Sequence, residues 1–440
     1  MSLNIVILAA GQGTRMKSSH PKVLHCLAGK PILQHVLETA ENLSPQNIYI
    51  IYGHQGEKIR EYFNHYLPNL IWVEQKEQLG TAHAVMQVLP YLNNPDEKVL
   101  ILSGDVPLIS KTTLEAGLLP SHFTRRRNDA GIVLWTTVLD NPTGFGRIIR
   151  NRDNKIIKIT EEKDASQTEK EIKEINAGIY LTTVKNLKTS LSQISQNNIQ
   201  KEFYLTDIVS EEIDVTDIIV QNPYEVYGVN DLEQLYLLEC YYQQNMAKKL
   251  RLSGVRVDQN VIFEGNIEIG TDSKIGANCI LKNIKIGRNT EIKPNSIIEN
   301  SIIGDDCRVG PFARIRPGTK LSSQVHIGNF VEIKNSDIHH KSKIPHLSYV
   351  GDTTMGESVN FGAGAITCNY DGANKHRTII GNNVFIGSDA QLIAPIKIED
   401  GSTIGAGSTI SKNTPANKLT ISRAKQQTIE HWVRPKKEEK

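Results

Sequence analysis

The chain has 440 residues, 39% hydrophobic and 22% charged, which predicts two or three ordinary globular domains. Its formal net charge of only +2 gives no electrostatic reason to expect nucleic acid or an anionic membrane as the main partner. Five scattered cysteines without a C-x-x-C pair, and the lack of a signal segment or an apolar run of about 18 residues, predict a cytoplasmic protein without disulfides, zinc or membrane insertion.

The first half of the chain predicts alternating strands and helices. Apolar runs lie at 4–8, 48–52, 70–73, 99–102 and 130–134, separated by polar stretches that are compatible with helices. This alternation is typical of a Rossmann-like α/β domain with a mostly parallel sheet and helices on both faces. Ligands are then expected at the carboxyl ends of the strands.

The first predicted strand runs directly into a glycine loop that contains Gly11 and Gly13 and is followed by Arg15 and Lys22. Successive N–H groups in such a loop can hold phosphate oxygens, and the two cations can neutralise phosphate charge. The loop matches neither common phosphate motif, because Met16 stands where a Rossmann loop has its third glycine and no Gly-Lys-Ser/Thr follows. Taken alone, the loop fits a structural turn as well as a phosphate site.

Residues 231–252 predict a long helix, because leucines recur there at helical spacing and Asp231 with Gln234 can form a capping box. A helix of about 20 residues is roughly 30 Å long, enough to act as an arm between two domains. The alternative is that it simply packs on the first domain.

After Ser253 an aliphatic residue recurs at every sixth position. The longest runs are Ile303, Val309, Ile315, Leu321, Ile327, Ile333 and then Ile380, Ile386, Leu392, Ile398, Ile404, Ile410. This period predicts a left-handed parallel β-helix in which three hexads close one triangular coil. The count of six is lost between Val350 and Ile380, and segments that interrupt a scaffold often carry binding groups. The last ten residues, rich in Lys and Glu, are expected to be disordered.

A family resemblance rests on three segments of the first half. They are 8–16 with His20-Pro21-Lys22, Glu77-Gln78-Leu79-Gly80-Thr81-Ala82-His83, and Gly104-Asp105-Val106-Pro107-Leu108. Together with the hexads and Cys368-Asn369-Tyr370-Asp371-Gly372, the whole chain resembles the bifunctional N-acetylglucosamine-1-phosphate uridyltransferase and glucosamine-1-phosphate N-acetyltransferase family. The resemblance implies a uridylyltransferase domain at 1–232, a helical linker at 233–253 and an acetyltransferase β-helix at 254–440.

The resemblance also implies the reactions. Glucosamine-1-phosphate is acetylated with acetyl-coenzyme A, and the N-acetylglucosamine-1-phosphate formed then receives UMP from UTP, which releases pyrophosphate. Mg²⁺ is the implied cofactor, and a homotrimer with acetyl sites shared between subunits is the implied assembly.

In the first domain the resemblance assigns Mg²⁺ to Asp105 and Asn230, and phosphate stabilisation to Arg15 and Lys22. One carboxylate, one amide oxygen and substrate phosphates suit an open magnesium site, although an Asp before Val-Pro can also simply end a strand. The other implied UTP contacts are Leu8, Ala9, Ala10, Gly11, Gln75, Gly80, Thr81, Ser103 and Gly104. The implied sugar contacts are Gly144, Glu161 and Asn176, where a slip of one residue would exchange Glu161 for Glu162.

In the second domain the resemblance makes His346 the general base that acetyl transfer to an amine requires. The implied glucosamine-1-phosphate contacts are Arg316, Lys334, Tyr349 and Asn360, and Lys375 is a further phosphate candidate. Arg316 and Lys334 each follow a ladder isoleucine directly, so both are expected to point outward. The implied acetyl-coenzyme A contacts are Ala363, Asn369, Tyr370, Ser388, Ala406 and Arg423.

Two other interpretations remain at this point. The coil could serve only to oligomerise or regulate a single-activity sugar-1-phosphate nucleotidyltransferase, but a passive coil has no reason to carry His346, Lys334 and Arg316. A metal-dependent hydratase is disfavoured because the histidines lack ligand spacing.

Overall fold

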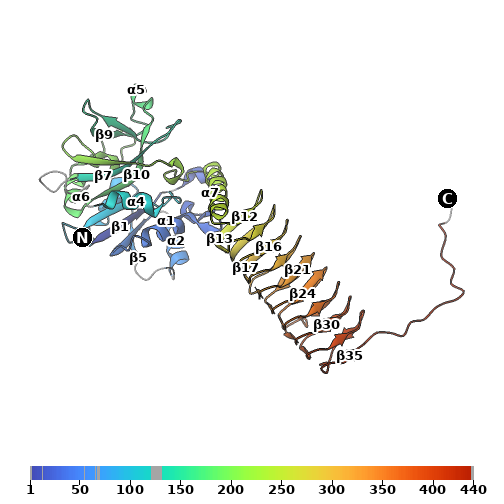
Figure 1. Ribbon diagram of the computed structural model, residues 1–440. Coiled ribbons are helices and arrows are strands. Elements are labelled where there is room, and N and C mark those ends of the chain that lie inside the picture. Colours follow the sequence, from blue (N-terminus) through green and yellow to red (C-terminus); the bar gives the residue numbers. More distant parts are fainter. Residues whose placement is uncertain are drawn as a thin grey trace. The chain divides into compact units, whose positions relative to one another are not determined.

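The computed structural model describes residues 2–11, 13–53, 55–64, 66, 70–119 and 131–437. The chain divides into two compact units, Met1–Tyr242 and Gln243–Lys440, and each is described by itself (Figure 1). No helix within these ranges is long and apolar enough to cross a membrane.

The first unit is built on one sheet whose strand order is β11-β7-β10-β6-β1-β4-β5. Its strands are β1 Leu3–Leu8, β4 Asn47–Tyr52, β5 Leu70–Glu74, β6 Lys98–Ser103, β7 Gly131–Val138, β10 Glu174–Thr183 and β11 Asp214–Ile219, with β8 Arg147–Arg150 and β9 Ile156–Thr160 attached beside β10. The β6-β1-β4-β5 half is parallel, whereas β10 runs antiparallel to both β6 and β7. The predicted α/β fold is confirmed, and β10 adds an antiparallel strand that the sequence pattern did not reveal.

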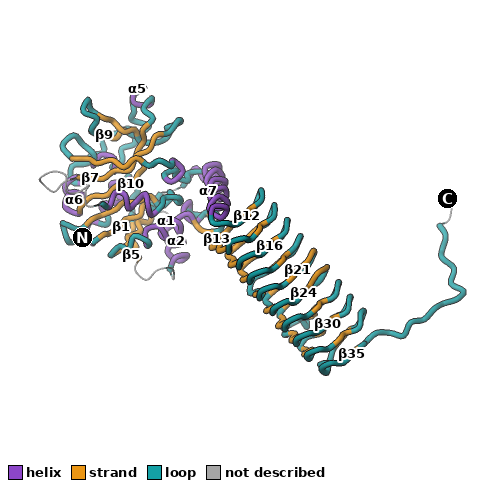
Figure 2. The backbone as a smooth tube through the Cα atoms, in the orientation of Figure 1, coloured by secondary structure: helices purple, strands orange, loops and turns teal. Residues whose placement is uncertain are grey.

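Helices cover both faces of this sheet (Figures 1 and 2). They are α1 Ile32–Glu41, α2 Gly56–Phe63, α3 Thr81–Met86, α4 Lys111–Leu118, α5 Gln167–Lys170 and α6 Val184–Leu191, with the short 3₁₀ turns η1 Thr14–Met16, η2 Lys22–Leu24, η3 Leu89–Tyr91, η5 Leu205–Ile208 and η6 Pro223–Glu225; β2 Cys26–Leu27 and β3 Lys30–Pro31 form a small hairpin. Alternate residues of β1 enter opposite cores: Ile5 and Ile7 pack in the same core as α1, and Val6 in the same core as α3. This double burial explains why β1 reads as a continuous apolar run.

The predicted linker helix is α7, Leu232–Leu252. In the first unit its Leu238 and Tyr242 pack with Leu27 and Ile32, and in the second unit Leu250 belongs to the core of the coil. The Asp231 side chain accepts from the Gln234 N–H at 2.8 Å, so half of the expected capping box forms. The other half differs, because Gln234 Oε1 accepts from the N–H of Asn230, at 2.8 Å, instead of Asp231. The compact units divide inside α7, and the three-part boundaries inferred from the resemblance stay a prediction.

The second unit is a parallel β-helix, as predicted, in which each regular coil contributes three short strands. One sheet forms a single face of the coil, here called the single-face sheet: β12 Arg256–Val257, β14 Lys274–Ile275, β16 Glu291–Ile292, β18 Arg308–Val309, β21 His326–Asn329, β24 Lys343–His346, β27 Asn360–Phe361, β30 Phe385–Ile386, β33 Thr403–Ile404 and β35 Leu419–Thr420.

The other sheet bends around β17 and supplies the two remaining faces; it is called the double-face sheet. Its strands are β13 Ile262–Ile269, β15 Ile280–Ile286, β17 Ile297–Ile303, β19 Arg314–Ile315, β20 Lys320–Leu321, β22 Glu332–Lys334, β23 Asp337–Ile338, β25 Tyr349–Gly351, β26 Thr353–Met355, β28 Ile366–Cys368, β29 Thr378–Ile380, β31 Gln391–Ile393, β32 Ile396–Ile398 and β34 Thr409–Ile410. Residues 421–437 contain neither helix nor strand.

The predicted loss of the hexad count between Val350 and Ile380 is largely wrong. Paired strands of successive coils lie either 17 or 18 residues apart, so a coil of 17 drops one residue from the count without leaving the fold. Met355 and Phe361 are fully buried in the same core as the aliphatic ladder, and they continue it through the apparent gap. Only the segment 369–377, between β28 and β29, leaves the regular coil.

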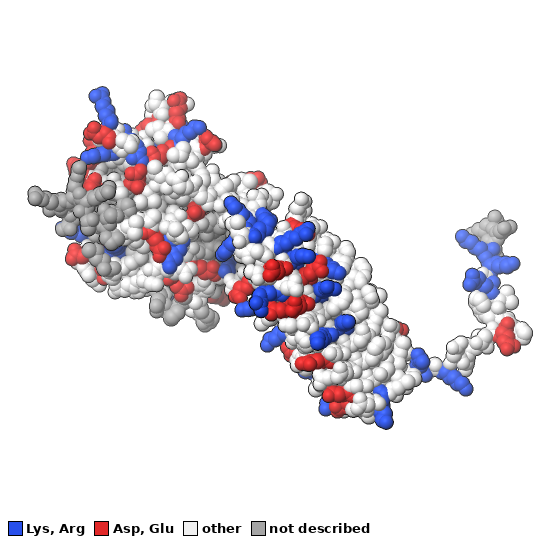
Figure 3. Space-filling view, in the orientation of Figure 1, with Lys and Arg blue, Asp and Glu red and all other residues white. Residues whose placement is uncertain are grey.

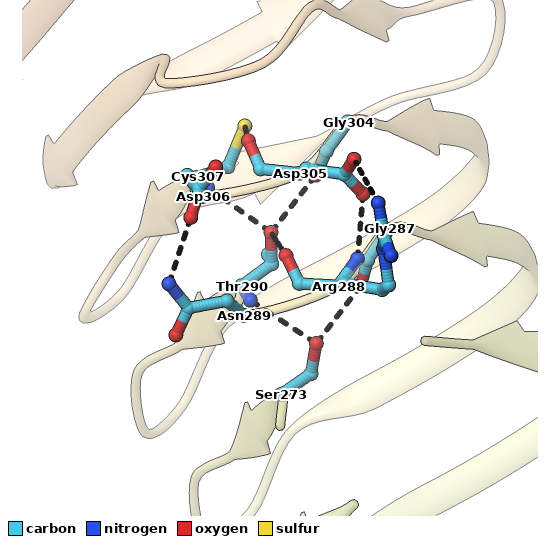
Figure 4. Close-up of polar contacts among 9 residues, drawn as sticks. All are labelled: Ser273, Gly287, Arg288, Asn289, Thr290, Gly304, Asp305, Asp306 and Cys307. Carbon is cyan, nitrogen blue, oxygen red and sulfur yellow. Dashed lines mark hydrogen bonds and ion pairs between the residues drawn. The ribbon is translucent and has the colours of Figure 1, made fainter. Parts of the chain in front are cut away.

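Corners of the coil are formed by Asn and Asp residues in the left-handed backbone region, such as Asn289 with φ 51° and Asp306 with φ 58°. Asn289 Nδ2 donates to Asp306 Oδ1 on the next coil at 2.7 Å, and Thr290 Oγ1 donates to the Gly304 carbonyl at 2.8 Å (Figure 4). Because Asn and Asp tolerate this conformation, each corner closes without a loop. Oppositely charged side chains alternate over the first coils in the same way, for example Glu264 with Lys282 at 2.9 Å (Figure 3).

Candidate functional sites

A cavity of about 460 Å³ opens at the carboxyl ends of β1 and β6 in the first unit. Ten residues from the predicted UTP set line it: Leu8, Ala9, Ala10, Gly11, Lys22, Gln75, Gly80, Thr81, Ser103 and Asp105. Gly104 lies behind the wall, where its N–H donates to the Leu8 carbonyl at 2.9 Å and joins the two strand ends. Sequence reasoning missed four lining residues, Val23, Gln78, Ala84 and Glu202, the last of which comes from a distant part of the chain.

Lys22, Asp105, Asn230 and Arg15 converge at one side of this cavity. The Lys22 ammonium bonds the Asp105 carboxylate and also lies 3.4 Å from Asn230 Oδ1, while Arg15 Nη2 donates to the same Asn230 oxygen at 2.9 Å. The backbone brings the two oxygen donors together, because the Val229 N–H donates to the Asp105 carbonyl at 2.9 Å. One carboxylate and one amide oxygen therefore face a shared cation, and this donor set fits a hard divalent ion such as Mg²⁺.

Gln75 is buried in the wall of the cavity, and its amide is already partly used. Its Nε2 lies 3.1 Å from the Gly80 carbonyl and 3.1 Å from His83 Nδ1, which accounts for both amide hydrogens. The carbonyl end of Gln75 is thus the group left for a ligand. His83 does not touch the cavity, and the sequence offered no signal for its orienting role.

The predicted sugar contacts lie together beside β10. A Cβ on Gly146 would be 3.7 Å from both Asn176 Cβ and Glu161 Oε1, so these two side chains flank one glycine. Glu161 accepts from Thr206 Oγ1 at 3.1 Å; burial raises the pKa of its carboxyl, and nearby Asp207 adds to this despite the bond from Thr206.

Glu162 is engaged differently. Its Oε2 lies 2.6 Å from the buried Arg147 guanidinium and accepts from the Gly144 N–H at 3.2 Å. Glu162 therefore anchors the Gly144 turn, and Glu161 is the carboxylate without an ion pair of the two. This geometry favours Glu161 as the sugar contact.

In the second unit, His346 and three of the predicted acetyl-coenzyme A residues occupy equivalent places on successive coils. Backbone bonds relate these coils: the Gly364 N–H donates to the Leu347 carbonyl, the Asp389 N–H to the Ala363 carbonyl, and the Gly407 N–H to the Ser388 carbonyl, at 2.8 to 3.0 Å. They form a column, here called the His346 column: His346, Ala363, Ser388 and Ala406. Arg423 ends it, donating through Nη1 to the Ala406 carbonyl at 2.8 Å. Adjacent strands are about 4.8 Å apart, so the small side chains leave a shallow strip several coils long beside the histidine.

Arg316, Lys334 and Tyr349 lie on the neighbouring face, in the double-face sheet. Glu332 pairs with Tyr349 and Lys334 with Gly351 on the coil above, and Arg316 Nη1 bonds Glu332 Oε1 at 2.7 Å. The expectation that Arg316 points outward fits its side chain, which is 39% exposed.

The inserted segment 369–377 folds back toward these cations. Tyr370 pairs with Lys375, and the Asp371 carboxylate accepts from the Asn374 N–H at 2.6 Å and contacts His376 Nε2 at 2.7 Å. The Lys375 side chain lowers the pKa of Lys334, with burial and Arg316 adding to the effect, so two ammonium groups from separate segments lie close together. Such a pair attracts a dianion.

Two predicted residues stand elsewhere than expected. Asn360 is not in the inserted segment but on β27, where it pairs with Lys343. Asn369 is buried and donates to Asp352, which also accepts from Asn335 at 2.6 Å, so it supports the inserted segment from inside.

These two units define a nucleotidyltransferase domain joined to a hexapeptide-repeat acyltransferase coil. Residues 5–157 match the MobA-like NTP transferase domain, residues 250–338 the GMPPB C-terminal domain, and residues 377–412 six repeats of the bacterial transferase hexapeptide.

Similar proteins cover the whole chain. Bifunctional protein GlmU of Nitrosomonas europaea is 50% identical, over 100% of this chain and 99% of the relative. The proteins of that name from Legionella pneumophila and Azoarcus sp. are 48% and 46% identical, over 100% and 99% of this chain and all of each relative. The chain therefore belongs to the GlmU family of bifunctional proteins. It is a uridylyltransferase and glucosamine-1-phosphate acetyltransferase of UDP-N-acetylglucosamine synthesis, and the passive-coil alternative is set aside.

Proposed function

We propose that UTP binds in the cavity of the first unit with its base against Gln75 to Thr81 and its phosphates between the glycine loop and Lys22. Mg²⁺ would be held by Asp105 and Asn230, which already share the ammonium of Lys22. When bound, such an ion neutralises phosphate charge and helps to orient the α-phosphorus.

The protein side chains supply the remaining stabilisation in this proposal. Lys22 and Arg15 donate to phosphate oxygens as negative charge moves onto the leaving pyrophosphate. Glu161 and Asn176 orient the N-acetylglucosamine-1-phosphate so that its phosphate oxygen attacks the α-phosphorus in line. The P–O bond to the sugar phosphate forms as the P–O bond to pyrophosphate breaks.

On the coil, Arg316, Lys334 and Lys375 bind the phosphate of glucosamine-1-phosphate, and Tyr349 and Asn360 orient the sugar. His346 accepts a proton from the amine as the nitrogen attacks the thioester carbonyl. The N–C bond forms, the C–S bond breaks, and the coenzyme leaves as a thiol with a proton returned by the imidazole. The pantetheine arm lies along the His346 column, where Ala363, Ser388 and Ala406 leave room for a thin chain.

Assembly of three copies completes the acetyl site in this proposal, and the enzyme works in the cytoplasm. The sugar ligands support a shared site, because Lys334 ends a strand of the double-face sheet whereas Asn360 begins a strand of the single-face sheet. A single sugar cannot face both sheets of one coil. An apolar corner beside His346, formed by Phe312, Phe330 and Leu347 at 49%, 56% and 65% exposure, offers a surface for a neighbouring copy.

The exposed position of His346 at the foot of its column is the observation on which the acetyl-transfer proposal rests. We expect His346→Ala to abolish acetyl transfer while uridylyl transfer stays within about twofold of wild type, because general-base catalysis alone contributes roughly 10²- to 10⁴-fold. Assays with acetyl-coenzyme A plus glucosamine-1-phosphate, and with UTP plus N-acetylglucosamine-1-phosphate, measure the two activities separately. Equal loss of both in a folded variant would contradict a two-site enzyme with this base.

A further inference from the structure

Asn329 lies directly beneath His346 on the preceding coil. We propose that Asn329 is a positioning residue that holds His346 in the tautomer with the proton on Nδ1 and the lone pair on Nε2. This inference rests on the proposed role of His346 as the base, and it adds a residue that no motif in the sequence marked.

Strand register fixes the pair. Asn329 ends β21 and His346 ends β24, and the two residues are direct partners in parallel pairing. The His346 Nδ1 atom lies 2.9 Å from Asn329 Oδ1. The backbone of His346 is held on both sides as well, because the Leu347 N–H donates to the Asn329 carbonyl at 3.0 Å and Ser348 Oγ donates to the His346 carbonyl at 2.7 Å.

A glycine allows this close approach. A Cβ on Gly328 would overlap the carbonyl group of Pro345, so a larger residue there would force β21 and β24 apart. Gly328 and Asn329 therefore act together in bringing the two strand ends within hydrogen-bond distance.

The chemistry follows from what each atom can do. An amide oxygen can only accept, so the imidazole must donate through Nδ1–H, and Nε2 is then the basic atom. Nε2 is also free of this contact on an exposed side chain, where it can meet the substrate amine. An amide orients the ring without the negative charge of a carboxylate, so it does not favour the imidazolium form that cannot act as a base.

The charged and titratable neighbours of His346 are known from the surrounding strands. Lys343 lies on its own strand, His326 on β21 and Tyr349 on the following strand, whereas the next coil presents Ala363. Burial lowers the pKa of His326, and Lys293, Arg308, Lys343 and His346 reinforce this. These groups are cationic or neutral, so a carboxylate introduced at position 329 would be the new element in the site.

Two substitutions test the proposal in the full-length enzyme. Asn329→Leu removes the acceptor at similar size, and we expect acetyl transfer to fall at least about 10-fold, within the roughly 10²- to 10⁴-fold that a general base supplies. Asn329→Asp keeps an acceptor and adds a charge that favours imidazolium, so the acid limb of the pH dependence of kcat/KM should move to higher pH while the plateau is largely retained. Asn266→Asp, on the first coil, adds the same charge far along the chain and should leave the profile unchanged.

Long-range ¹H–¹⁵N spectra of histidine-labelled protein, with His346→Ala for assignment, read the tautomer directly. Protonation at Nδ1 in wild type, lost in Asn329→Leu, supports the proposal. Wild-type rates and an unshifted acid limb in both Asn329 variants, together with an inactive His346→Ala, would overturn the role of Asn329 alone. An active His346→Ala would instead overturn the proposed base. Uridylyl transfer reports that each variant is folded.

Discussion

Lys22 occupies a position in which one ammonium group serves two partners. It bonds Asp105 and approaches Asn230, the two oxygen donors proposed for Mg²⁺, and it is also a proposed phosphate ligand. A divalent ion must displace this ammonium, which then becomes available to the phosphates. Metal and nucleotide should consequently assist each other's binding, because each relieves what the other must displace.

Lys22→Met tests this arrangement through a reversal of expected effects. Uridylyl transfer should be lost, yet Mn²⁺ should bind more tightly to the nucleotide-free enzyme, because the competing ion pair is worth about 1 kcal/mol, or roughly fivefold in affinity. Electron paramagnetic resonance of free Mn²⁺ measures the affinity without turnover. Lys17→Met, an exposed lysine nearby, should change nothing, and weaker Mn²⁺ binding in Lys22→Met would contradict the competition.

At the scale of elements, the segment 369–377 is a compact loop ordered by one carboxylate. Asp371 accepts from the N–H groups of Asn374 and Ala373 and contacts His376. The N–H of Asn374, together with His376 and Ala373, lowers the pKa of the Asp371 carboxyl, so the carboxylate supports the loop above the ordinary Asp range. That support is lost only as the pH falls through the lowered value, well below neutral assay conditions.

Asp371→Ala should therefore loosen Tyr370 and Lys375 without unfolding the coil. We expect KM for acetyl-coenzyme A and glucosamine-1-phosphate to rise roughly tenfold or more, because small displacements of positioning groups carry large kinetic costs. Uridylyl transfer and the thermal midpoint should stay near wild type. Asp258→Ala removes an exposed carboxylate that pairs with Arg256 on the first coil, and it is the matched control. An unchanged KM in Asp371→Ala would show that the loop does not depend on this carboxylate.

The same element shows how far the sequence could be interpreted. The period of six predicted the coil and its inward residues, because inward positions must be aliphatic wherever strands stack. It failed from Val350 onward, since a 17-residue coil shifts the count by one and Met355 and Phe361 can fill the same core. Asn360 was consequently assigned to an insertion when it lies on a regular strand.

Residues that act through other residues were beyond the sequence. His83 and Asn329 matter only because the fold brings them against Gln75 and His346, and no local spacing marks either contact. Glu202 lines the nucleotide cavity from a segment that Gly80 approaches through the backbone of Phe203. The residues assigned by resemblance, in contrast, lie in short motifs at strand ends, and ten of them surround one cavity.

At the scale of the whole molecule, two phosphate-binding chemistries coexist with a net charge of only +2. Each proposed site concentrates a few cations locally, Arg15 and Lys22 in the first unit and Arg316, Lys334 and Lys375 in the second. The sites share no residue, so each activity can be removed by substitutions that leave the other intact.

The two faces used by the proposed sugar ligands make the assembly testable. Lys334 and Asn360 lie on different sheets of one coil, so a sugar that touches both must lie between two copies of the chain. Lys334→Ala and Asn360→Ala should each impair acetyl transfer strongly when purified alone. Co-expressed with different tags and mixed at random, they should recover about a quarter of wild-type acetyl transfer, since that fraction of shared sites receives an intact residue from each neighbour.

Uridylyl transfer should be the same in both variants and in the mixture, because it does not use these residues. Sedimentation of the mixed sample should give a single trimeric species. If the ligands belong to one chain, the mixture can do no better than the mean of the two variants. A monomer with full acetyl transfer would exclude shared sites, whereas recovery near a quarter would assign the two ligands to neighbouring chains.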